Sequence, residues 1–340
     1  MKAAVYKGVG APLVLEDQET PTAGFGEMVL RVKACGVCGS DIHAAETGFV
    51  AVGQVMGHEF CGEIVEIGEG VSGWQLGENV LGVPAWFCGG CDNCNAGDHL
   101  HCLNLKNFGF DHACQGAYAE YARIKAGCAI RVPKNLSNEH AVLYEPLSVA
   151  LSSFNRAGIS NSDRILIIGG GPIGLSIALV AKKFGVSYIG LSECQAERLQ
   201  RAGSCGVTVP IDATEHADPV AAFKAATGQE PTVIFECVGL PGILKQIINF
   251  APPNARIMVS GTGMKPEEIT VVDAALKHLQ LSFTFGYEAE EITWILEALA
   301  KGEIDPSPLL STGVSLNELP AMFETLKQPN SECKVVMTGL

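Results

Sequence analysis

Short apolar runs separated by glycine make up the first 130 residues, which show little of the 3.6-residue spacing of an amphipathic helix. Runs of this length, bounded by turn-forming residues, predict strands. The clearest runs cover residues 28–34, 61–67, 79–83 and 118–124. We therefore expect a β-rich N-terminal region, with a distorted barrel as its natural architecture.

The pattern changes in the middle of the chain. Residues 138–155 have helix-compatible spacing, and from residue 164 strands and helices alternate, beginning with RILIIGGGPIGLSIALVAKKFG. Such alternation predicts a parallel, doubly wound sheet. The further elements expected are strands at 186–193, 232–236, 256–260, 279–285 and 333–337, and helices at 194–206 and 288–300.

Length and charge narrow the class of protein. A chain of 340 residues suggests about two domains of roughly 150 residues each. The formal net charge is -14 and no long basic run occurs, which disfavours a polyanionic partner such as nucleic acid. The opening MKAAVYKGVG lacks the charged-then-apolar pattern of a secretory signal, and the apolar stretches are too short or broken to span a bilayer. We expect a cytoplasmic protein without membrane or nucleic-acid partners.

A glycine turn gives the strongest cofactor signal. Gly169, Gly171 and Gly174 form G-x-G-x-x-G directly after the strand at 164–168 and at the mouth of a helix. The first glycine permits the tight turn, the second lets a pyrophosphate approach the backbone, and the third lets helix and strand pack closely. Pro172 suits the first helical turn, and Ile173 follows it within the motif.

An acid at the end of the second strand supports a dinucleotide site. Glu193 lies where such a sheet needs a carboxylate for the ribose hydroxyls, about 20 residues on. A carboxylate there repels a 2′-phosphate, so we expect NAD, while Ser192 and Arg198 leave room for NADP. The alternative interpretation is a glycine-rich turn followed by a solvated glutamate.

Cysteine spacing predicts a metal site. The chain has 13 Cys, an odd number that, without a secretion signal, indicates a reducing compartment where clustered cysteines more often bind metal than form disulfides. Four of them lie in FCGGCDNCNAGDHLHC, namely Cys88, Cys91, Cys94 and Cys102. Four thiolates occupy all four coordination positions of a tetrahedral zinc ion and leave none for water or substrate. The site would therefore be a structural zinc site. Iron–sulfur ligation is the rival that spacing alone leaves open.

A second, dispersed set of ligand residues precedes and follows that cluster. It consists of Cys38 in CGSDIH, His58 and Glu59 in GHE, and Glu145 in YEPLSVA. Alone, each has an ordinary interpretation: a core thiol, a hydrogen-bonded loop histidine, or a helix-cap or surface acid. Their joint occurrence beside a thiolate site and a dinucleotide turn favours a metal centre.

Together these motifs resemble the medium-chain, zinc-containing alcohol dehydrogenases from end to end. CGSDIH, GHE, the four-Cys lobe, EPLSVA, GGGPIG and FECVG occur in that family's order. The resemblance implies a GroES-like catalytic domain at 1–148 and 288–340, with its structural-zinc lobe at 86–104, and an inserted Rossmann domain at 149–287. It also implies two zinc ions per subunit, NAD, a small alcohol or carbonyl substrate, and a homodimer or homotetramer.

The resemblance also assigns residue roles. Cys38 and His58 would ligate the catalytic zinc, and Glu59 would be a ligand or an outer partner. Glu145 resembles the sorbitol and threonine dehydrogenase branch and would bind zinc directly, through water, or as the cofactor enters. Ser40 matches the hydroxyl between substrate and proton relay, and His43 the relay histidine. The residues expected along the cofactor crevice are Cys237, Val238 and Gly261, although Cys237 could equally serve packing.

Two departures bear on the substrate. AAETG after His43 lacks the aromatic residue common in sorbitol dehydrogenases, and LSFTFGY has Thr284 where polyol enzymes tend to carry Arg. A less polar, secondary alcohol or its ketone is therefore the favoured substrate, with a polyol or L-threonine dehydrogenase as the alternative. Alternatives of other classes are a catalytically inactive nucleotide-binding relative and a zinc module for partner recognition, which the acidic chain disfavours.

Overall fold

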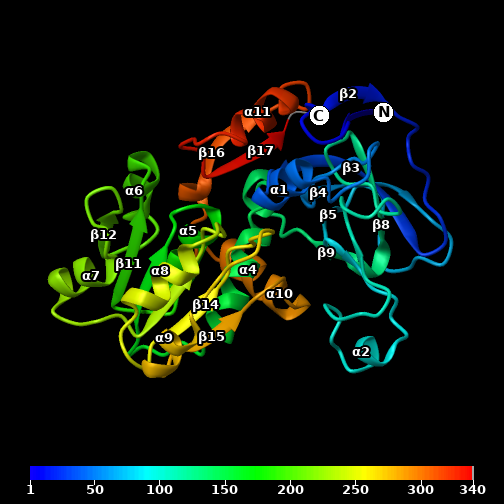
Figure 1. The fold of residues 1–340 in the computed structure, drawn as a ribbon. Helices are drawn as coiled ribbons and strands as arrows, with labels where there is room; N and C mark the ends of the chain where they lie inside the picture. Colours follow the sequence, from blue (N-terminus) through cyan, green and yellow to red (C-terminus); the bar gives the residue numbers. More distant parts are fainter. Residues whose placement is uncertain (339–340) are drawn as a thin grey trace. The chain divides into compact units, whose positions relative to one another are not determined.

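The computed structural model describes residues 1–338, which form two compact units (Figure 1). Unit 1 comprises residues 1–144 together with the described residues from 310 onward, and unit 2 comprises residues 145–309. Unit 1 is therefore built from two separate stretches of chain. The domain boundaries expected at 148/149 and 287/288 stay a prediction, because compactness does not decide which domain residues 288–309 serve.

Unit 1 is mostly β-structure. Its helices are α1 (Gly39–Thr47), α2 (Asp92–Asn95), α3 (Asn138–Ala141) and α11 (Leu319–Leu326), with a 3-10 turn at Ala126–Cys128. Its strands are β1 (Lys2–Val5), β2 (Val14–Asp17), β3 (Glu27–Gly36), β4 (Glu59–Ile67), β5 (Asn79–Gly82), β6 (Ala85–Trp86), β7 (Lys106–Asn107), β8 (Tyr121–Lys125), β9 (Ala129–Arg131), β16 (Leu310–Val314) and β17 (Lys334–Thr338).

The long strand β3 organises unit 1. The main sheet has the order β16-β17-β3-β4-β5-β9, and β8 also pairs with β3. β8 pairs with the first half of β3, and β17 with its last three residues. One strand thus gathers the N-terminal and C-terminal stretches around a single core that includes Met28, Leu30, Phe60, Tyr118 and Phe323. The β-rich first region is confirmed.

Unit 2 contains a six-stranded parallel sheet in the order β12-β11-β10-β13-β14-β15. Its strands are β10 (Arg164–Ile168), β11 (Tyr188–Glu193), β12 (Val209–Asp212), β13 (Val233–Glu236), β14 (Arg256–Val259) and β15 (Gln280–Phe283). Its helices are α4 (Tyr144–Arg156), α5 (Pro172–Lys183), α6 (Ala196–Ala202), α7 (Pro219–Thr227), α8 (Ile243–Phe250), α9 (Val271–Leu276) and α10 (Ala289–Ala300), with a 3-10 turn at Ser307–Leu309. This strand order is that of a dinucleotide-binding fold and confirms the predicted doubly wound sheet.

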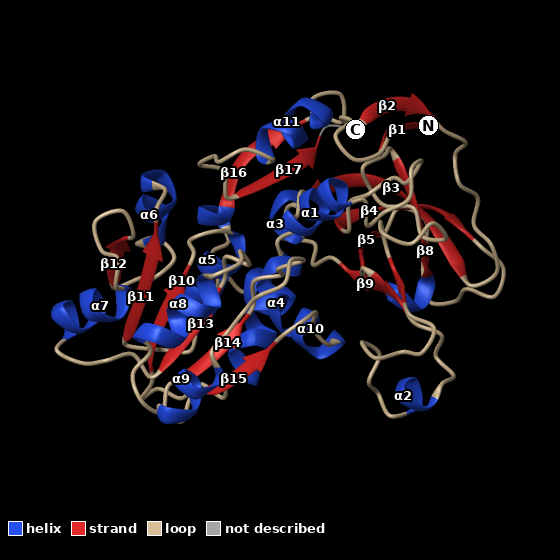
Figure 2. Cartoon of the chain, viewed as in Figure 1, coloured by secondary structure: helices blue, strands red, loops and turns tan. Residues whose placement is uncertain are grey.

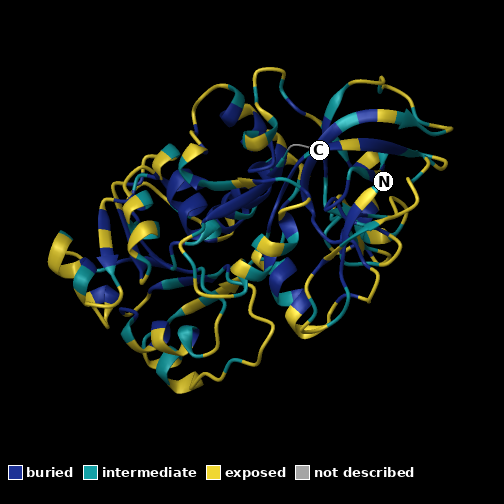
Figure 3. Ribbon diagram, turned by 90° about the horizontal axis from the view of Figure 1, so that it is seen from above, coloured by how far each residue is buried: buried dark blue, intermediate teal, exposed yellow. Residues whose placement is uncertain are grey.

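Helices cover both faces of this sheet (Figure 2). Leu166 and Ile168 of β10 join a core cluster with Phe223 of α7 and Ile247 of α8. Because side chains alternate along a strand, the intervening Ile167 faces the opposite side, where it lies against α5 at Gly174. The inner strands β10, β11 and β13 are accordingly almost wholly buried, whereas β15 at the edge of the sheet is largely exposed. Figure 3 shows buried residues as dark ribbon and exposed residues in yellow.

Proline explains one departure from the sequence-based elements. The helix expected over 138–155 is interrupted, so that α3 ends at Ala141 and α4 begins at Tyr144. Pro146 lies in the first turn of α4, where its missing N–H is not needed. In a continuous helix its ring would clash with the carbonyl of Val142, four residues earlier. Two helices therefore form instead of one. Among residues 1–338, no helix has the length and apolar character required to cross a membrane.

Candidate active site and metal centres

Antiparallel pairing brings the first group of ligand residues together. Gly36 at the end of β3 pairs with Glu59 at the start of β4. The chain leaving β3 therefore reaches Cys38 beside the chain that enters β4 through His58. One ligand atom each of Cys38, His58 and Glu59 lies within 4.8 Å of the others. Sulfur, imidazole nitrogen and carboxylate oxygen are the donors that zinc binds in proteins, so the group fits this ion.

Asp41 fixes the orientation of His58. The buried Asp41 carboxylate lies 3.2 Å from His58 Nδ1 and accepts a 2.6 Å hydrogen bond from the Tyr118 hydroxyl. Burial alone would lower the pKa of His58, but the negative charge and hydrogen bond of Asp41 raise it well above its ordinary value. With Nδ1 facing Asp41, Nε2 is the nitrogen left for a metal, an arrangement common for metal-binding histidines.

Glu59 is engaged by a lysine from the far end of the chain. Lys334 Nζ donates to Glu59 Oε1 at 2.6 Å and to Oε2 at 2.8 Å, and both side chains are buried. Sequence patterns gave no sign of this pair, because 275 positions separate the two residues. Both carboxylate oxygens thus have a partner within the protein.

The two relay residues lie on one helix. Ser40 Oγ donates to Cys38 Sγ at 3.1 Å, which puts the hydroxyl next to the ligand sulfur. His43 follows three positions later on α1, and residues with this spacing are neighbours on a helix surface. His43 Nδ1 lies 4.0 Å from Glu46, and its side chain is 40% exposed.

One aromatic ring lies against His58 and a second packs against the first, a feature that sequence reasoning missed. The Phe110 ring centroid lies 5.2 Å from that of His58, and Phe49 meets Phe110 edge-on at 6.3 Å. Phe49 itself is 64% exposed. The imidazole is therefore bordered by apolar surface on one side.

Glu145 is not brought into this ligand group by the structure. It lies in the first turn of α4, is buried, and belongs to unit 2, whereas Cys38, His58 and Glu59 belong to unit 1. Its role as a ligand stays a prediction.

The four lobe cysteines converge as expected from their spacing. One sulfur from each of Cys88, Cys91, Cys94 and Cys102 lies within 4.8 Å of the others, with the 88–94 and 91–102 pairs at 4.0 Å. A tetrahedral ion with metal–sulfur bonds of about 2.3 Å has sulfurs about 3.8 Å apart. The lobe therefore fits a four-thiolate zinc ion. Backbone N–H groups of Gly90 and Cys91 lower the pKa of Cys88 to about 6, whereas burial raises that of Cys94 to about 12.

The three glycines of the nucleotide motif are subject to different structural constraints. Gly169 has φ of 101°, in the left-handed region. A Cβ at Gly174 would lie 1.9 Å from the Gly169 carbonyl oxygen, so no side chain fits between helix and strand. A Cβ at Gly171 would meet nothing within 4 Å, which leaves open space at the N-terminus of α5, where Pro172 is the first helical residue. Ile173 follows it there, partly buried.

Glu193 closes β11 beside this turn. Its Oε2 accepts from the Gly170 N–H at 2.7 Å, and its Oε1 accepts from the N–H groups of Cys194 and Gln195 at 2.7 and 2.8 Å. The acid therefore shapes the turn, and its role toward the ribose stays a prediction.

The residues expected along the crevice lie at the same carboxyl edge of the sheet. A Cβ at Gly169 would approach Val238 to 2.8 Å, and the Cys237 N–H donates to Ile168 O at 2.9 Å. Gly261 has no room for a side chain, because a Cβ there would lie 2.4 Å from the Gly239 nitrogen. Burial raises the pKa of the Cys237 thiol well above its ordinary value.

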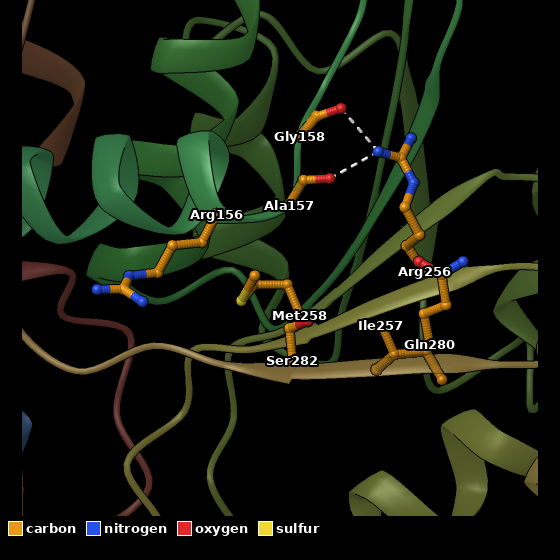
Figure 4. A pocket seen from close by; sticks show the side chains of 8 residues that line it. All are labelled: Arg156, Ala157, Gly158, Arg256, Ile257, Met258, Gln280 and Ser282. Carbon is orange, nitrogen blue, oxygen red and sulfur yellow. Dashed lines mark hydrogen bonds between the residues drawn. The ribbon is translucent and has the colours of Figure 1, made fainter.

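A cavity of about 270 Å³ elsewhere in unit 2 is not part of this site (Figure 4). It is lined by Arg256 and Gln280, the first residues of β14 and β15, whereas the glycine turn follows the carboxyl end of β10. As Figure 4 shows, Arg256 donates to the carbonyls of Ala157 and Gly158, at 2.6 and 2.7 Å. It also bonds Asp163, so its guanidinium is committed to the fold.

Comparisons with known proteins agree with this geometry. Residues 24–134 match the alcohol dehydrogenase GroES-like domain, and residues 172–301 match the zinc-binding dehydrogenase family. The chain is 31% identical over 330 residues to the starvation-sensing protein RspB of Escherichia coli, covering 96% of each chain. It is 30% identical over 346 residues to an L-threonine 3-dehydrogenase of Rhizobium etli, covering 99% and 98% of the two chains.

A solved structure extends the match to the whole fold. The E. coli rspB structure, complexed with NADH, superposes with a TM-score of 0.89 at 30% identity over 100% of this chain and 99% of that one. Fold and metal groups thus define a zinc-dependent, NAD-dependent oxidoreductase that acts on CH–OH groups. The chain belongs to the medium-chain, zinc-containing alcohol dehydrogenase family.

Proposed function

We propose that this enzyme interconverts a small secondary alcohol and its ketone, with NAD as the hydride carrier. The observation that carries the proposal is the group of Cys38, His58 and Glu59, in which His58 is already oriented by Asp41. In this proposal Cys38 and His58 hold the catalytic zinc, and Glu145 is a further candidate ligand. The four lobe cysteines hold the second, structural ion.

The residues of α1 would handle the proton. When bound, zinc supplies the positive charge that lowers the pKa of the substrate hydroxyl, and NAD accepts the hydride. Ser40, whose hydroxyl lies beside Cys38, takes the substrate proton and passes it toward His43. The partly exposed His43 can release that proton to water. Reduction of a ketone uses the same groups in the opposite direction.

The glycine turn would bind the cofactor. The open space at Gly171 and the N-terminal N–H groups of α5 suit a pyrophosphate. Glu193 would accept from the ribose hydroxyls and disfavour a 2′-phosphate, hence NAD rather than NADP. Cys237, Val238 and Gly261 would border the nicotinamide side of the crevice.

The aromatic pair supports a less polar substrate. Phe110 lies against His58 and Phe49 packs edge-on against Phe110, so these rings give one side of the imidazole an apolar border. The same substrate preference is favoured by position 284, where this chain has Thr284 and polyol enzymes tend to carry Arg. L-Threonine stays the second candidate, because a relative of that name is 30% identical over nearly the whole chain.

The test is a substrate panel combined with one ligand substitution. Secondary alcohols, polyols and L-threonine are compared with NAD and with NADP by absorbance of the reduced cofactor. We expect Cys38→Ser to abolish turnover while NADH binding, followed by fluorescence, stays within about twofold. Cys205→Ser, a buried cysteine outside both metal groups, is the matched control and should keep activity.

The outcomes separate the alternatives. Full activity in Cys38→Ser would disprove the assignment of the metal ligand. NADH binding without turnover of any substrate would instead indicate a nucleotide-binding protein without catalysis. A preference for polyols or L-threonine would replace the secondary alcohol as the substrate class.

We also propose that the chain forms a homo-oligomer through the open edge of the six-stranded sheet. Within residues 1–338, β15 pairs with β14 alone, and α9, β15 and the residues just after β15 expose five large apolar side chains: Val271, Val272, Leu276, Phe283 and Phe285. Residues 271–285 contain one Asp and one Lys, so this segment carries no net charge, whereas the chain has a net charge of -14. A second acidic copy can approach it without strong repulsion, and an unpaired apolar edge favours such contact.

We propose that the protein is cytoplasmic. Within residues 1–338 no two cysteines are joined by a disulfide, and two metal groups depend on thiolates. Both features suit a reducing compartment.

A further inference from the structure

Lys334 is the one buried Lys or Arg among residues 1–338. Its side chain is 2% exposed, and that of its partner Glu59 is 1% exposed. Isolating a charge of either sign from water is strongly unfavourable, and a buried ion pair often contributes no more stability than apolar residues of the same volume. Stability alone therefore gives little reason for a lysine at this position of β17.

The three contacts of the ammonium group point to the metal site. Nζ donates to both oxygens of Glu59 and, at 3.2 Å, to the backbone oxygen of Val37. An ammonium group has three N–H donors, so all three are used. Val37 directly precedes Cys38, and Glu59 directly follows His58. One cation thus joins the backbone of the residue before Cys38 to the side chain of the residue after His58.

Glu59 is close enough to compete for the metal. One of its oxygens lies within 4.8 Å of the ligand atoms of Cys38 and His58, yet both oxygens are bonded to Lys334. A carboxylate with two short charge-assisted hydrogen bonds is held firmly. If these bonds were lost, the buried carboxylate would have zinc as its nearest available cation.

We propose that Lys334 is a positioning residue that keeps Glu59 out of direct zinc coordination and so leaves a position open for the substrate oxygen. The inference rests on the proposed assignment of the catalytic zinc to Cys38 and His58. It answers the question left by the sequence, which allowed Glu59 as a ligand or as an outer partner. It also gives the C-terminal strand a role in setting the coordination number.

The test uses Co²⁺ in place of zinc, because the visible absorption of Co²⁺ is strong with four ligands and weaker with five. We expect Lys334→Met to keep about two metal ions per chain, to weaken the visible band, and to lower kcat by about 10- to 100-fold with unchanged NADH binding. Lys334→Arg, which keeps a cation for Glu59, should keep the wild-type spectrum. The four-cysteine lobe contributes the same signal in every variant.

A double variant distinguishes positioning from packing. Lys334→Met combined with Glu59→Gln removes both charges, and the amide is a poor zinc ligand, so the band should return toward that of Glu59→Gln alone. If Lys334→Met does not fold, the neutral double variant and Lys334→Arg still test the proposal. A weakened band in the double variant, or a wild-type band in Lys334→Met, would overturn it.

Cys38→Ser separates this inference from the proposed function. A chain that keeps two ions and an unchanged spectrum after Cys38→Ser would refute the metal assignment itself. If Cys38→Ser loses one ion while Lys334→Met keeps the wild-type spectrum, only the role of Lys334 fails.

Discussion

Three donors converge on Asp41, although in the sequence it is simply the acid within CGSDIH. Its carboxylate faces His58 Nδ1, the Tyr118 hydroxyl and, at 3.4 Å, the backbone N–H of Cys38. Burial alone would raise the pKa of Asp41, but the charge and hydrogen bonds around it lower the pKa instead. Asp41 is therefore an ionised acid that orients one ligand residue and contacts the backbone of another.

Asp163 offers a test of a single charge away from the active site. Burial alone would raise its pKa, but hydrogen bonds from Arg256, the Ser160 backbone and Thr232 lower the pKa below its ordinary value. We expect Asp163→Asn to reduce the free energy of unfolding by about 1.5–3 kcal/mol at pH 7, the range for hydrogen bonds to a charged group.

The pH dependence of that difference follows from the sign of the shift. A lowered pKa in the folded state means that the stabilisation is complete above about pH 4, where the unfolded carboxyl is ionised, and declines as the pH falls further. Urea unfolding of both proteins at pH 7, 5 and 3.5 measures the difference. A difference in stability between wild type and Asp163→Asn that does not change with pH would contradict the lowered pKa of Asp163 in the folded protein.

At the scale of single elements, the glycine turn was predictable because its constraints are local. The first strand, the turn, the helix and the second strand lie within residues 164–193, so the sequence alone predicted the glycines Gly169, Gly171 and Gly174 and the acid Glu193. The structure adds that Glu193 also binds the turn through the Gly170 N–H.

Two glycines of the turn should respond differently to alanine. Gly174→Ala places a methyl group against the Gly169 carbonyl, and we expect a stability loss of about 1–3 kcal/mol. Gly171→Ala meets no protein atom, so stability should stay unchanged, while NADH affinity should fall at least tenfold, or about 1.4 kcal/mol.

Thermal unfolding and NADH fluorescence titration measure the two effects. Gly203→Ala, also in open space with φ of -60°, is the matched control and should affect neither quantity. Equal NADH affinity in wild type and Gly171→Ala would show that the pyrophosphate does not occupy this space.

At the scale of the whole molecule, contacts between residues were harder to predict the farther apart the residues lie in the sequence. The four lobe cysteines were found because they lie within 15 positions, and the parallel sheet because strands and helices alternate. Lys334 and Glu59, or Phe110 and His58, carry no local pattern that links them. The pairing of β3 with β4 and β17 brings Lys334 to Glu59, and backbone hydrogen bonds join residues 116–118 to residues 55–57, next to His58.

The open edge of β15 predicts how the molecule assembles. We expect light scattering after size exclusion to give a dimer or tetramer for the wild type and a smaller species for Phe283→Glu. Leu76→Glu is the matched control, because Leu76 is as exposed as Phe283 but lies in unit 1. This variant should keep the wild-type mass. A monomeric wild type, or an unchanged mass for Phe283→Glu, would exclude this interface.

The place of β17 in unit 1 has a consequence for how the protein is made. A ribosome releases Cys38, His58 and Glu59 early, then all of unit 2, and only afterwards the strand that carries Lys334. Unit 2 is continuous and can fold as it emerges, whereas unit 1 must wait for its second stretch of chain. During that interval Glu59 has no lysine partner. Zinc that arrives during translation would meet a different set of ligands from zinc that arrives after it.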